Sequence, residues 1–319
     1  MRLTNRPVLC NYYVTYRCNA ACDFCDIWEK PSPYVTLENV KKNLQDLKRL
    51  GVKVIDFTGG EPLLHRDLPL FLEEAKRLGF TTTVTTNCLL YPKHAEKLRG
   101  KIDMLHFSLD SPVAGEHNRS RNVDCFDHLV RSIYIAKSLG ERPDILFTVF
   151  NENIHHLPQM YHDFAMKYGL ILILNPVFRY NNVGAELSPE NLDILSRWGK
   201  RKNVYLNDAF IALRREGGNH IERPVCKAAS TTVVISPENK MILPCYHLEI
   251  EAIPIDDNLY ALRHSPEMKE SIAMEGKYKE CEGCTINCYF QSSFAVDVTP
   301  YFFKALPSTL KYGLEKWVY

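Results

Sequence analysis

The sequence lacks the long apolar runs and the charge excess that mark membrane and nucleic-acid-binding proteins. Its longest apolar run, "LILIL" at residues 170–174, is far shorter than a membrane span. Basic and acidic residues nearly balance, at 39 and 38, and no dense block of lysine and arginine appears, so we expect no nucleic-acid partner. The opening stretch "MRLTNRPVLCNYYV" lacks the apolar core of a secretory signal, which predicts a cytoplasmic location.

Cysteine, in contrast, is abundant, with 11 residues in a chain of 319. In a reducing compartment thiols stay free or bind metal rather than form disulfides. Three cysteines stand alone and are expected to be small buried hydrophobes, namely Cys10, Cys88 and Cys125. The other eight fall into two groups, one of three at residues 18–25 and one of five at residues 226–288. Both groups are therefore candidate metal sites.

The first half of the chain alternates predicted strands and helices. Strand-like segments occupy residues 8–15, 52–58, 80–87, 102–110, 144–151 and 170–176, and helix-like segments occupy residues 36–51, 67–79, 126–140 and 157–169. About six strand–helix units with short connections predict an α/β fold with a parallel sheet, and we favour a partial (β/α)6 barrel over a flat sheet.

The strand–helix pattern weakens beyond about residue 180. A helical piece at residues 188–202 precedes "TTVVISPENKMILPC" (231–245), which predicts a hairpin in which Asn239 takes the left-handed conformation of the turn. We expect two domains, a barrel at residues 1–200 and a small cysteine-rich domain with an aromatic tail at residues 201–319.

Four polar or cysteine-containing segments follow predicted strands of the first half. They are the loop "CNAACDFC" (18–25), "GGEP" (59–62), "TTN" (85–87) and "SLD" (108–110). Because reactive residues of parallel α/β folds gather at the carboxyl ends of strands, we expect these segments to form one active site. The loop carries Cys18, Cys22 and Cys25 with the spacing C-x3-C-x2-C. Three thiolates can ligate three irons of a 4Fe–4S cluster and leave the fourth iron open.

This arrangement resembles the radical S-adenosylmethionine (SAM) superfamily over about residues 1–180. The resemblance implies that Cys18, Cys22 and Cys25 hold a catalytic 4Fe–4S cluster. It also implies contacts to SAM from Gly59, Gly60, Glu61, Asn87, Ser108 and Asp110, with Phe24 either near the adenine or in the core. Arg119 and Arg121 either reach a carboxylate or are solvated loop charges.

The resemblance also implies a reaction. In that family a reduced cluster cleaves SAM to a 5′-deoxyadenosyl radical, which takes a hydrogen atom from the substrate. A low-potential electron donor such as flavodoxin or ferredoxin would then be a partner. The end of the reaction is left open between oxidation, carbon–sulfur or carbon–carbon bond formation and adenosyl transfer.

The second cysteine group resembles the shortened twitch form of the SPASM extension, which binds an auxiliary 4Fe–4S cluster. We expect its ligands to be Cys226, Cys245, Cys281 and Cys284, with Cys288 as the alternative to Cys281 or a spare thiol nearby. A four-cysteine zinc site is the competing interpretation, because zinc accepts the same ligands.

Two other classes of function remain open in the sequence, a non-catalytic iron–sulfur electron carrier and a zinc-binding interaction protein. The substrate is unidentified, and a peptide, a small metabolite and a lipid or isoprenoid are all considered. The tail "YFFKALPSTLKYGLEKW" (301–317) mixes aromatic residues with lysine, as interfacial helices do. We expect it to pack over the barrel mouth rather than to contact a membrane.

Overall fold

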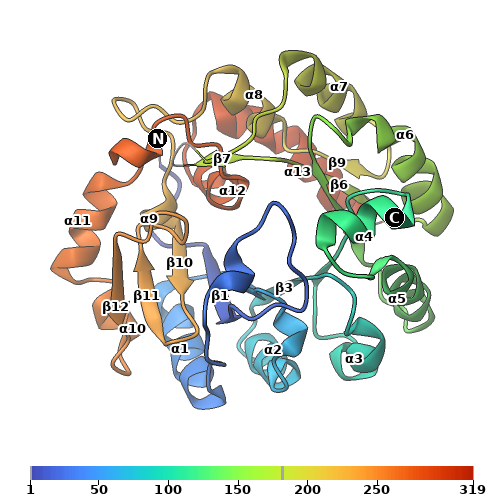
Figure 1. Cartoon of the computed structure of the whole chain (residues 1–319). Helices are drawn as coiled ribbons and strands as arrows, with labels where there is room; N and C mark the ends of the chain where they lie inside the picture. The colour runs from blue at the N-terminus through green and yellow to red at the C-terminus, as the bar shows by residue number, and fades with distance from the viewer. Residues whose placement is uncertain (1, 181–182, 319) are drawn as a thin grey trace.

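The computed structural model describes residues 2–180 and 183–318, and its centre is a ten-stranded sheet curved into a partial barrel (Figure 1). In sheet order the strands are β12 (Glu251–Pro254), β11 (Lys240–Leu243), β10 (Thr232–Ile235), β1 (Leu9–Thr15), β2 (Val54–Gly59), β3 (Thr81–Thr86), β4 (Met104–Ser108), β5 (Asp144–Val149), β6 (Leu172–Pro176) and β9 (Val204–Tyr205). Strand β10, strands β1 to β6 and β9 are parallel, whereas β11 and β12 are antiparallel. The predicted partial barrel of six strand–helix units is confirmed.

Helices lie around the sheet, most of them on its outer side (Figure 1). They are α1 (Leu37–Leu50), α2 (Leu68–Arg77), α3 (Tyr91–Leu98), α4 (Ala114–Arg121), α5 (Phe126–Ser138), α6 (Leu157–Met160), α7 (Pro189–Gly199), α8 (Asp208–Arg215), α9 (Ala228–Thr231), α10 (Leu259–Leu262), α11 (Pro266–Met274), α12 (Asn287–Val296) and α13 (Pro300–Trp317). Shorter elements are the 3-10 turns Ile27–Glu29, Pro62–Leu64, Ile154–His156 and Lys279–Cys281, the π-helical turn Tyr161–Met166 and the small hairpin β7 (Arg179–Tyr180) and β8 (Val183–Gly184).

Helix α1 illustrates how local sequence sets these elements. Thr36 caps its start by accepting a hydrogen bond from the backbone N of Asn39, and Gly51 ends it with a left-handed φ of 89°. Leu44 and Leu47 lie on the buried face of the helix and are fully enclosed against the sheet. The predicted segment at residues 36–51 is therefore a helix with the expected cap and stop.

Two helices of the first half were not predicted, α3 and α4. Helix α4 has the sequence "AGEHNRSR", in which only His117 and Arg121 are buried. A helix without an apolar stripe gives no periodic signal, so its presence depends on tertiary contacts rather than on its own pattern. The predicted helix at residues 157–169 is also divided, with α6 followed by the π-helical turn.

The cysteine-rich half of the chain continues the barrel's own sheet. Strand β10 pairs in parallel with β1, with Leu9 opposite Thr232 and Tyr12 opposite Ile235. The hairpin predicted at residues 231–245 is confirmed as β10 and β11, and Asn239 in its turn has a φ of 59°. The strand that leads into the first cysteine group therefore pairs directly with a strand of the cysteine-rich half.

The prediction for the aromatic tail is wrong in its position. Helix α13 packs against the barrel, but at the amino ends of the strands, opposite to the mouth. Lys316 Nζ lies 2.9 Å from Oδ1 of Asp144, the first residue of β5, and Tyr312 donates to Oδ2 of the same carboxylate at 2.7 Å. No helix among the described residues is both long and apolar enough to span a membrane.

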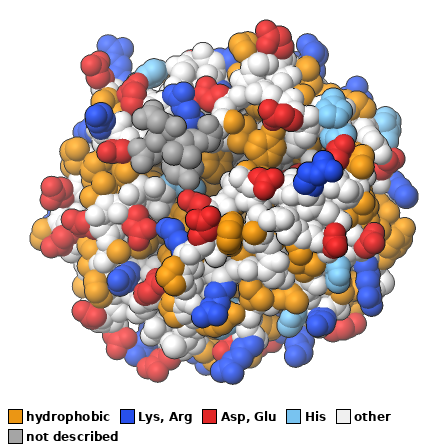
Figure 2. All heavy atoms as spheres, viewed as in Figure 1, with side chains coloured by type: hydrophobic (Ala, Val, Ile, Leu, Met, Phe, Trp, Pro, Cys, Tyr) orange, Lys and Arg blue, Asp and Glu red, His pale blue; other side chains and the backbone are white. Residues whose placement is uncertain are grey.

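One face of the molecule, seen along the barrel, shows acidic and basic side chains interspersed over its described part (Figure 2). Orange apolar side chains lie between them rather than in one block. This surface matches the near-neutral balance of charges in the sequence.

Candidate functional site

The first three cysteines lie in the loop that follows β1, at the carboxyl ends of the parallel strands. The loop is tied to the end of α4 by hydrogen bonds from Ala21 N to Arg121 O and from Asp23 N to Ser120 O, both 3.2 Å. A pocket at this position is lined by all three cysteines, by Phe24 of the same loop and by Arg121 of α4. The ends of β2, β3 and β4 contribute Thr58, Gly59, Gly60, Glu61, Thr85, Asn87 and Ser108. The chain thus brings together every residue that the resemblance assigned to the cluster and SAM, apart from Asp110.

The two glycines of "GGEP" let β2 approach the cysteine loop closely. A Cβ atom on Gly59 would lie 2.0 Å from the carbonyl oxygen of Thr15, and one on Gly60 would lie 2.2 Å from that of Arg17. Two hydrogen bonds join the same backbones, from Gly60 N to Thr15 O and from Glu61 N to Arg17 O, both 2.9 Å. The glycines therefore fix the loop immediately before Cys18, in addition to lining the pocket.

Glu61 braces the site from within. Its Oε1 accepts hydrogen bonds from Thr86 Oγ1 at 2.8 Å and Leu63 N at 3.1 Å, and its Oε2 accepts one from Asn87 N at 2.9 Å. Burial raises the pKa of Glu61 to about 7, although these donors and Arg121 favour the charged form. Both carboxylate oxygens are thus engaged in holding the ends of β2 and β3 together.

Asn87 and Asn19 extend this bracing to the cysteine loop. The side-chain nitrogen of Asn87 donates to Asn19 Oδ1 at 2.8 Å, and Asn19 directly follows Cys18. Ser108, at the end of β4, is 5% exposed and also lines the pocket. Sequence reasoning did not find Asn19, because an asparagine in a loop carries no specific signal.

Arg121 is a buried cation at the edge of the pocket. Its Nε donates to Asp110 Oδ2 at 2.6 Å, its Nη1 lies 3.8 Å from Cys22 Sγ, and its guanidinium lies 5.2 Å from the centre of the Phe24 ring. Burial alone would lower the pKa of Arg121, but the charges of Asp110 and Cys22 outweigh that effect and raise it. Arg121 is therefore a pocket residue rather than a solvated loop charge, whereas Arg119 is exposed.

Asp110 lies outside the pocket, whereas Phe24 lies at its rim. Asp110 lies behind Arg121 and does not line the pocket, and its Oδ1 is buried without a hydrogen-bond partner. Phe24 lies at the rim, 38% exposed, with its ring centre 5.2 Å from that of Phe150. Asp110 is thus placed to position Arg121, and Phe24 is not a core residue.

The surroundings of the three thiols of the loop favour the neutral form of each thiol. Burial raises the pKa of Cys18 to about 11 and also raises the pKa values of Cys22 and Cys25. Such thiols ionise at neutral pH only when positive charge is bound to them. Soft thiol donors next to a pocket fit a 4Fe–4S cluster.

In the second group the structure separates one cysteine from the other four. Burial is the main cause that raises the pKa values of Cys226, Cys245 and Cys284, and the charge of Cys281 raises all three further. Cys288 lies in the first turn of α12. Its pKa is raised by burial and by the charge of Asp56 in β2, and no other cysteine contributes to that shift.

Buried polar side chains hold the segments around Cys226, Cys281 and Cys284 in place. The amide of Asn219 donates to Cys281 O at 3.1 Å and accepts from Cys226 N at 3.2 Å. Arg214 binds Thr285 O at 3.3 Å and Val177 O at 2.9 Å, which ties the segment after Cys284 to the end of β6. These contacts join residues far apart in sequence, so no local motif predicts them.

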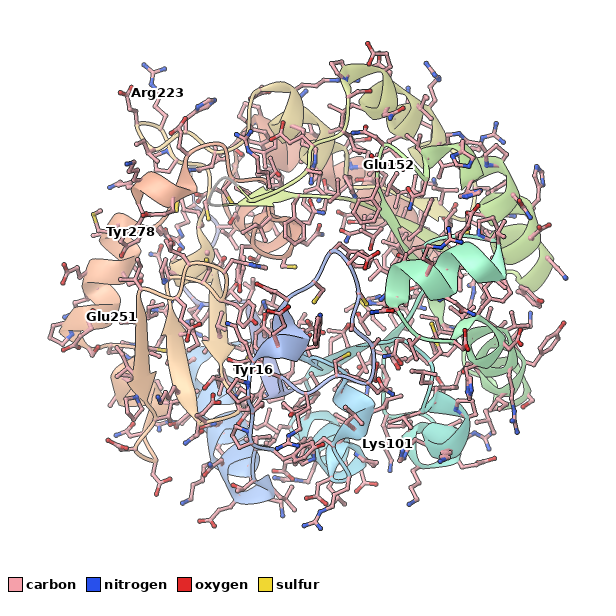
Figure 3. The ribbon with its side chains drawn as sticks, in the orientation of Figure 1. Tyr16, Lys101, Glu152, Arg223, Glu251 and Tyr278 are labelled. Carbon is pink, nitrogen blue, oxygen red and sulfur yellow. The ribbon has the colours of Figure 1, made fainter. Side chains whose placement is uncertain are left out.

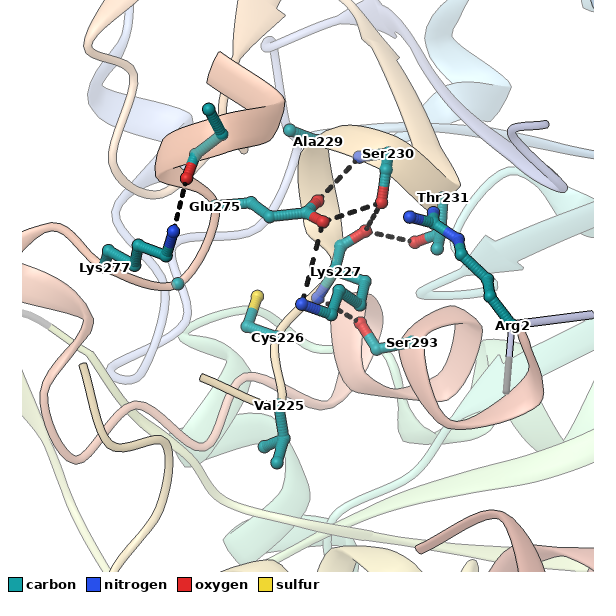
Figure 4. Close-up of polar contacts among 12 residues, drawn as sticks. Arg2, Val225, Cys226, Lys227, Ala229, Ser230, Thr231, Glu275, Lys277 and Ser293 are labelled. Atoms are coloured by element: carbon teal, nitrogen blue, oxygen red, sulfur yellow. Dashed lines mark hydrogen bonds and ion pairs between the residues drawn. The ribbon is translucent and has the colours of Figure 1, made fainter. Parts of the chain in front are cut away.

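Glu275 supports the segment after Cys226, as the close-up in Figure 4 shows. Its carboxylate accepts hydrogen bonds from Ser230 N at 2.8 Å and Ser230 Oγ at 2.9 Å, and Lys227 Nζ lies 4.0 Å away. In Figure 3, Arg223, Glu251 and Tyr278 of this half lie along one side of the molecule, whereas Tyr16, which precedes the first cysteine loop, lies nearer the centre.

Across the described residues, no three His, Cys, Asp or Glu side chains are close enough to hold a single metal ion. The assignment of metals to either cysteine group therefore rests on the chemistry and placement of the thiols.

The family model described as the radical SAM superfamily matches residues 12–164. This chain carries a radical SAM domain. The family implies a 4Fe–4S cluster and SAM, and the match spans the cysteine loop and the strand ends that form the pocket. The radical SAM domain thus coincides with strands β1 to β5 and the helices between them.

Curated relatives of the radical SAM domain have several activities. An S-adenosylmethionine-dependent nucleotide dehydratase from Selenomonas ruminantium is 34% identical over 140 residues, which are 41% of this chain and 51% of the relative. An AdoMet-dependent heme synthase from Nitratidesulfovibrio vulgaris is 27% identical over 46% of this chain and 42% of the relative. A probable GTP 3′,8-cyclase from Methanococcus maripaludis is 26% identical over 64% of this chain and 70% of the relative. The chain thus spans about half the length of the first of these relatives.

Solved structures share the fold over more of the chain. Streptococcus suis SuiB bound to its precursor peptide SuiA covers 91% of this chain and 71% of SuiB, with a TM-score of 0.69 and 16% identity. The protein anSMEcpe with bound AdoMet covers 97% of both chains, with a TM-score of 0.64 and 18% identity. The similarity therefore extends beyond the radical SAM domain into the cysteine-rich half.

Proposed function

We propose that this chain is a radical SAM enzyme that cleaves SAM reductively at the pocket of Cys18, Cys22 and Cys25 and takes a hydrogen atom from a substrate. When bound and reduced, the cluster supplies the electron that converts SAM to methionine and a 5′-deoxyadenosyl radical. A low-potential donor such as flavodoxin or ferredoxin would deliver that electron. We keep peptides, small metabolites and lipids as candidate substrate classes at this stage.

The observation that carries this proposal is the absence of a free fourth ligand among the described residues of the pocket. Three cysteines line it, and the one carboxylate that lines it, Glu61, has both oxygens engaged in hydrogen bonds. A cluster held there would keep one iron open for SAM. Gly59 and Gly60 set the loop against β2, and Arg121 places a positive charge beside Cys22.

The second part of the proposal concerns residues 201–319, as a twitch-like region. Cys226, Cys245, Cys281 and Cys284 would hold an auxiliary 4Fe–4S cluster. Their mutual proximity and the buried contacts of Asn219 support this ligand set. Zinc is the competing occupant, and an iron and sulfide count separates the two.

The test is the formation of 5′-deoxyadenosine by anaerobically reconstituted protein with SAM and dithionite. We expect product from the wild type and from Cys125→Ala, a lone buried cysteine outside both groups, and none from Cys25→Ala. A wild-type protein with a filled N-terminal cluster that forms no 5′-deoxyadenosine would refute the proposal. A colourless protein that contains zinc and no sulfide would refute it as well.

A further inference from the structure

Asp56, in β2, is a carboxylate inside the barrel for which the described chain supplies no partner. Its neighbours Ile55 and Phe57 are fully buried in the core between sheet and helices, so Asp56 points to the opposite, inner face of the sheet. No hydrogen bond or ion pair reaches its side chain from the described residues, and burial raises its pKa to about 7. A partly buried carboxylate of this kind is stabilised when a cation pairs with it.

The position of Asp56 relative to the SAM pocket follows from the strand geometry. Thr58 lines that pocket, and Asp56 lies two residues earlier on the same face, about 7 Å deeper in the barrel. Strand β4 repeats the pattern, because Ser108 lines the pocket and His106 lies two residues before it. A second level of polar side chains therefore lies directly beneath the pocket.

Cys288, which belongs to α12 rather than to a strand, is a further group near Asp56. It lies in α12 between the buried residues Asn287 and Tyr289, yet it is itself exposed. The charge of Asp56 raises the pKa of Cys288, and the charge of Cys288 raises the pKa of Tyr13 of β1, so Cys288 lies on the side of the sheet that these two residues face. Asp56 is also part-exposed, so neither group is sealed from solvent.

The other ionisable groups near this level are already compensated. Asp144 is paired with Lys316 at 2.9 Å, and His106 has its pKa lowered to about 4 by burial, so it is neutral at physiological pH. The residues paired with Asp56 across the sheet, Asn11 and Thr83, are uncharged. Asp56 is therefore the one uncompensated charge identified at this level among the described residues.

We infer that Asp56 binds a cationic nitrogen of the substrate, an ammonium or guanidinium group, and so holds the reacting carbon beneath the SAM pocket. A substrate cation would satisfy the carboxylate with charge-assisted hydrogen bonds. A nucleoside triphosphate, the substrate in the name of the cyclase relative, would bring negative charge toward it. This inference rests on the proposed function and narrows its substrate class to amines, including basic peptide side chains.

The test uses deuterium transfer from three small probes of similar size, perdeuterated n-butylammonium, n-butanol and n-butyrate. In each turnover one carbon–deuterium bond of the probe breaks and one forms on the 5′ carbon of 5′-deoxyadenosine. The carbon radical that remains takes up one electron, supplied by excess dithionite, together with one proton from solvent, which forms its new carbon–hydrogen bond. The holoenzyme is incubated with SAM and each probe, and the labelled fraction of 5′-deoxyadenosine is measured by mass spectrometry. We expect the ammonium probe to label at least about tenfold more than butyrate.

Two variants make the result specific. Asp56→Asn should bring the ammonium-to-butyrate ratio close to one, whereas Thr83→Val, which alters the uncharged neighbour across the sheet, should keep the preference. Each ratio is taken within one protein preparation, so a change in cluster content does not affect it.

The inference is overturned if butyrate labels as well as the ammonium probe, if Asp56→Asn keeps the preference, or if 5′-deoxyadenosine forms without label from any probe. Failure of the proposed function gives a different result, namely no 5′-deoxyadenosine from any preparation with a filled cluster.

Discussion

The contact between β2 and the cysteine loop predicts that Gly60→Ala disables the site while the fold survives. The new Cβ would lie 2.2 Å from Arg17 O and 2.5 Å from Tyr16 O, and both are backbone atoms that no side-chain rotation can move. Contacts below 3.0 Å are essentially absent from proteins, so the backbones must separate by about 0.8 Å.

That displacement acts on the residue directly before Cys18. It also stretches the hydrogen bonds from Gly60 N to Thr15 O and from Glu61 N to Arg17 O, each 2.9 Å. A misplacement of about 1 Å at a reacting centre can cost about a hundredfold in rate. We therefore expect the rate of 5′-deoxyadenosine formation to fall by about a hundredfold, with a much smaller change in thermal unfolding.

The assay compares Gly60→Ala with Gly115→Ala, both as reconstituted proteins with SAM and dithionite. Gly115 lies in α4, and a Cβ there meets nothing within 4 Å, so this variant makes the same chemical change without the collision. If Gly60→Ala keeps the rate of Gly115→Ala at equal iron content, then the close approach does not position the cluster loop.

The remaining predictions address the second cysteine group, the tail and Asp56. Cys284→Ser should lose the auxiliary iron, about half of the about eight irons expected for two clusters, whereas Cys288→Ser should keep it; equal iron loss in both would contradict the separation of Cys288. Lys316→Ala should destabilise the fold by about 3–5 kcal/mol in thermal unfolding, because Asp144 then remains buried without the cation that pairs with it and keeps only the hydrogen bond from Tyr312, whereas the exposed Lys304→Ala should be close to neutral. Because burial raises the pKa of Asp56 to about 7, its ionisation destabilises the folded state as pH rises through that value. Asp56→Asn should therefore gain about 1.4 kcal/mol of stability relative to the wild type between about pH 6 and 8, and a constant difference over that range would argue against a raised pKa.

The sequence predicted the parts of the fold that have their own periodic signal. Six parallel strands, helix α1 with its caps and the hairpin around Asn239 all follow from local pattern. The polar helix α4 did not, because it has no apolar stripe, and its Arg121 reaches the pocket only through tertiary structure. The position of α13 was wrong because an aromatic, lysine-rich tail does not specify which end of a barrel it covers.

For the site, the spacing of the motifs predicted which segments form the pocket, but it did not predict the role of each residue there. Asp110 lies behind Arg121, and Glu61 directs its oxygens to the neighbouring strands. Such roles depend on side-chain direction and on partners about 10 to 25 residues away, which a single sequence does not encode locally. Asp56 could have been singled out from the sequence, because a carboxylate is unusual within an apolar strand such as "VIDFT".

The parallel pairing of β1 with β10 has a consequence for how the protein matures. The strand that leads into Cys18 is synthesised well before one of its two neighbours, which includes Thr232, more than two hundred residues later. Until that late segment arrives, β1 has an open edge, and the loop it carries is anchored on one side only. Iron delivery to a fully formed catalytic loop would then follow synthesis of the cysteine-rich half, so a chain truncated before residue 232 should emerge from assembly without a stable cluster.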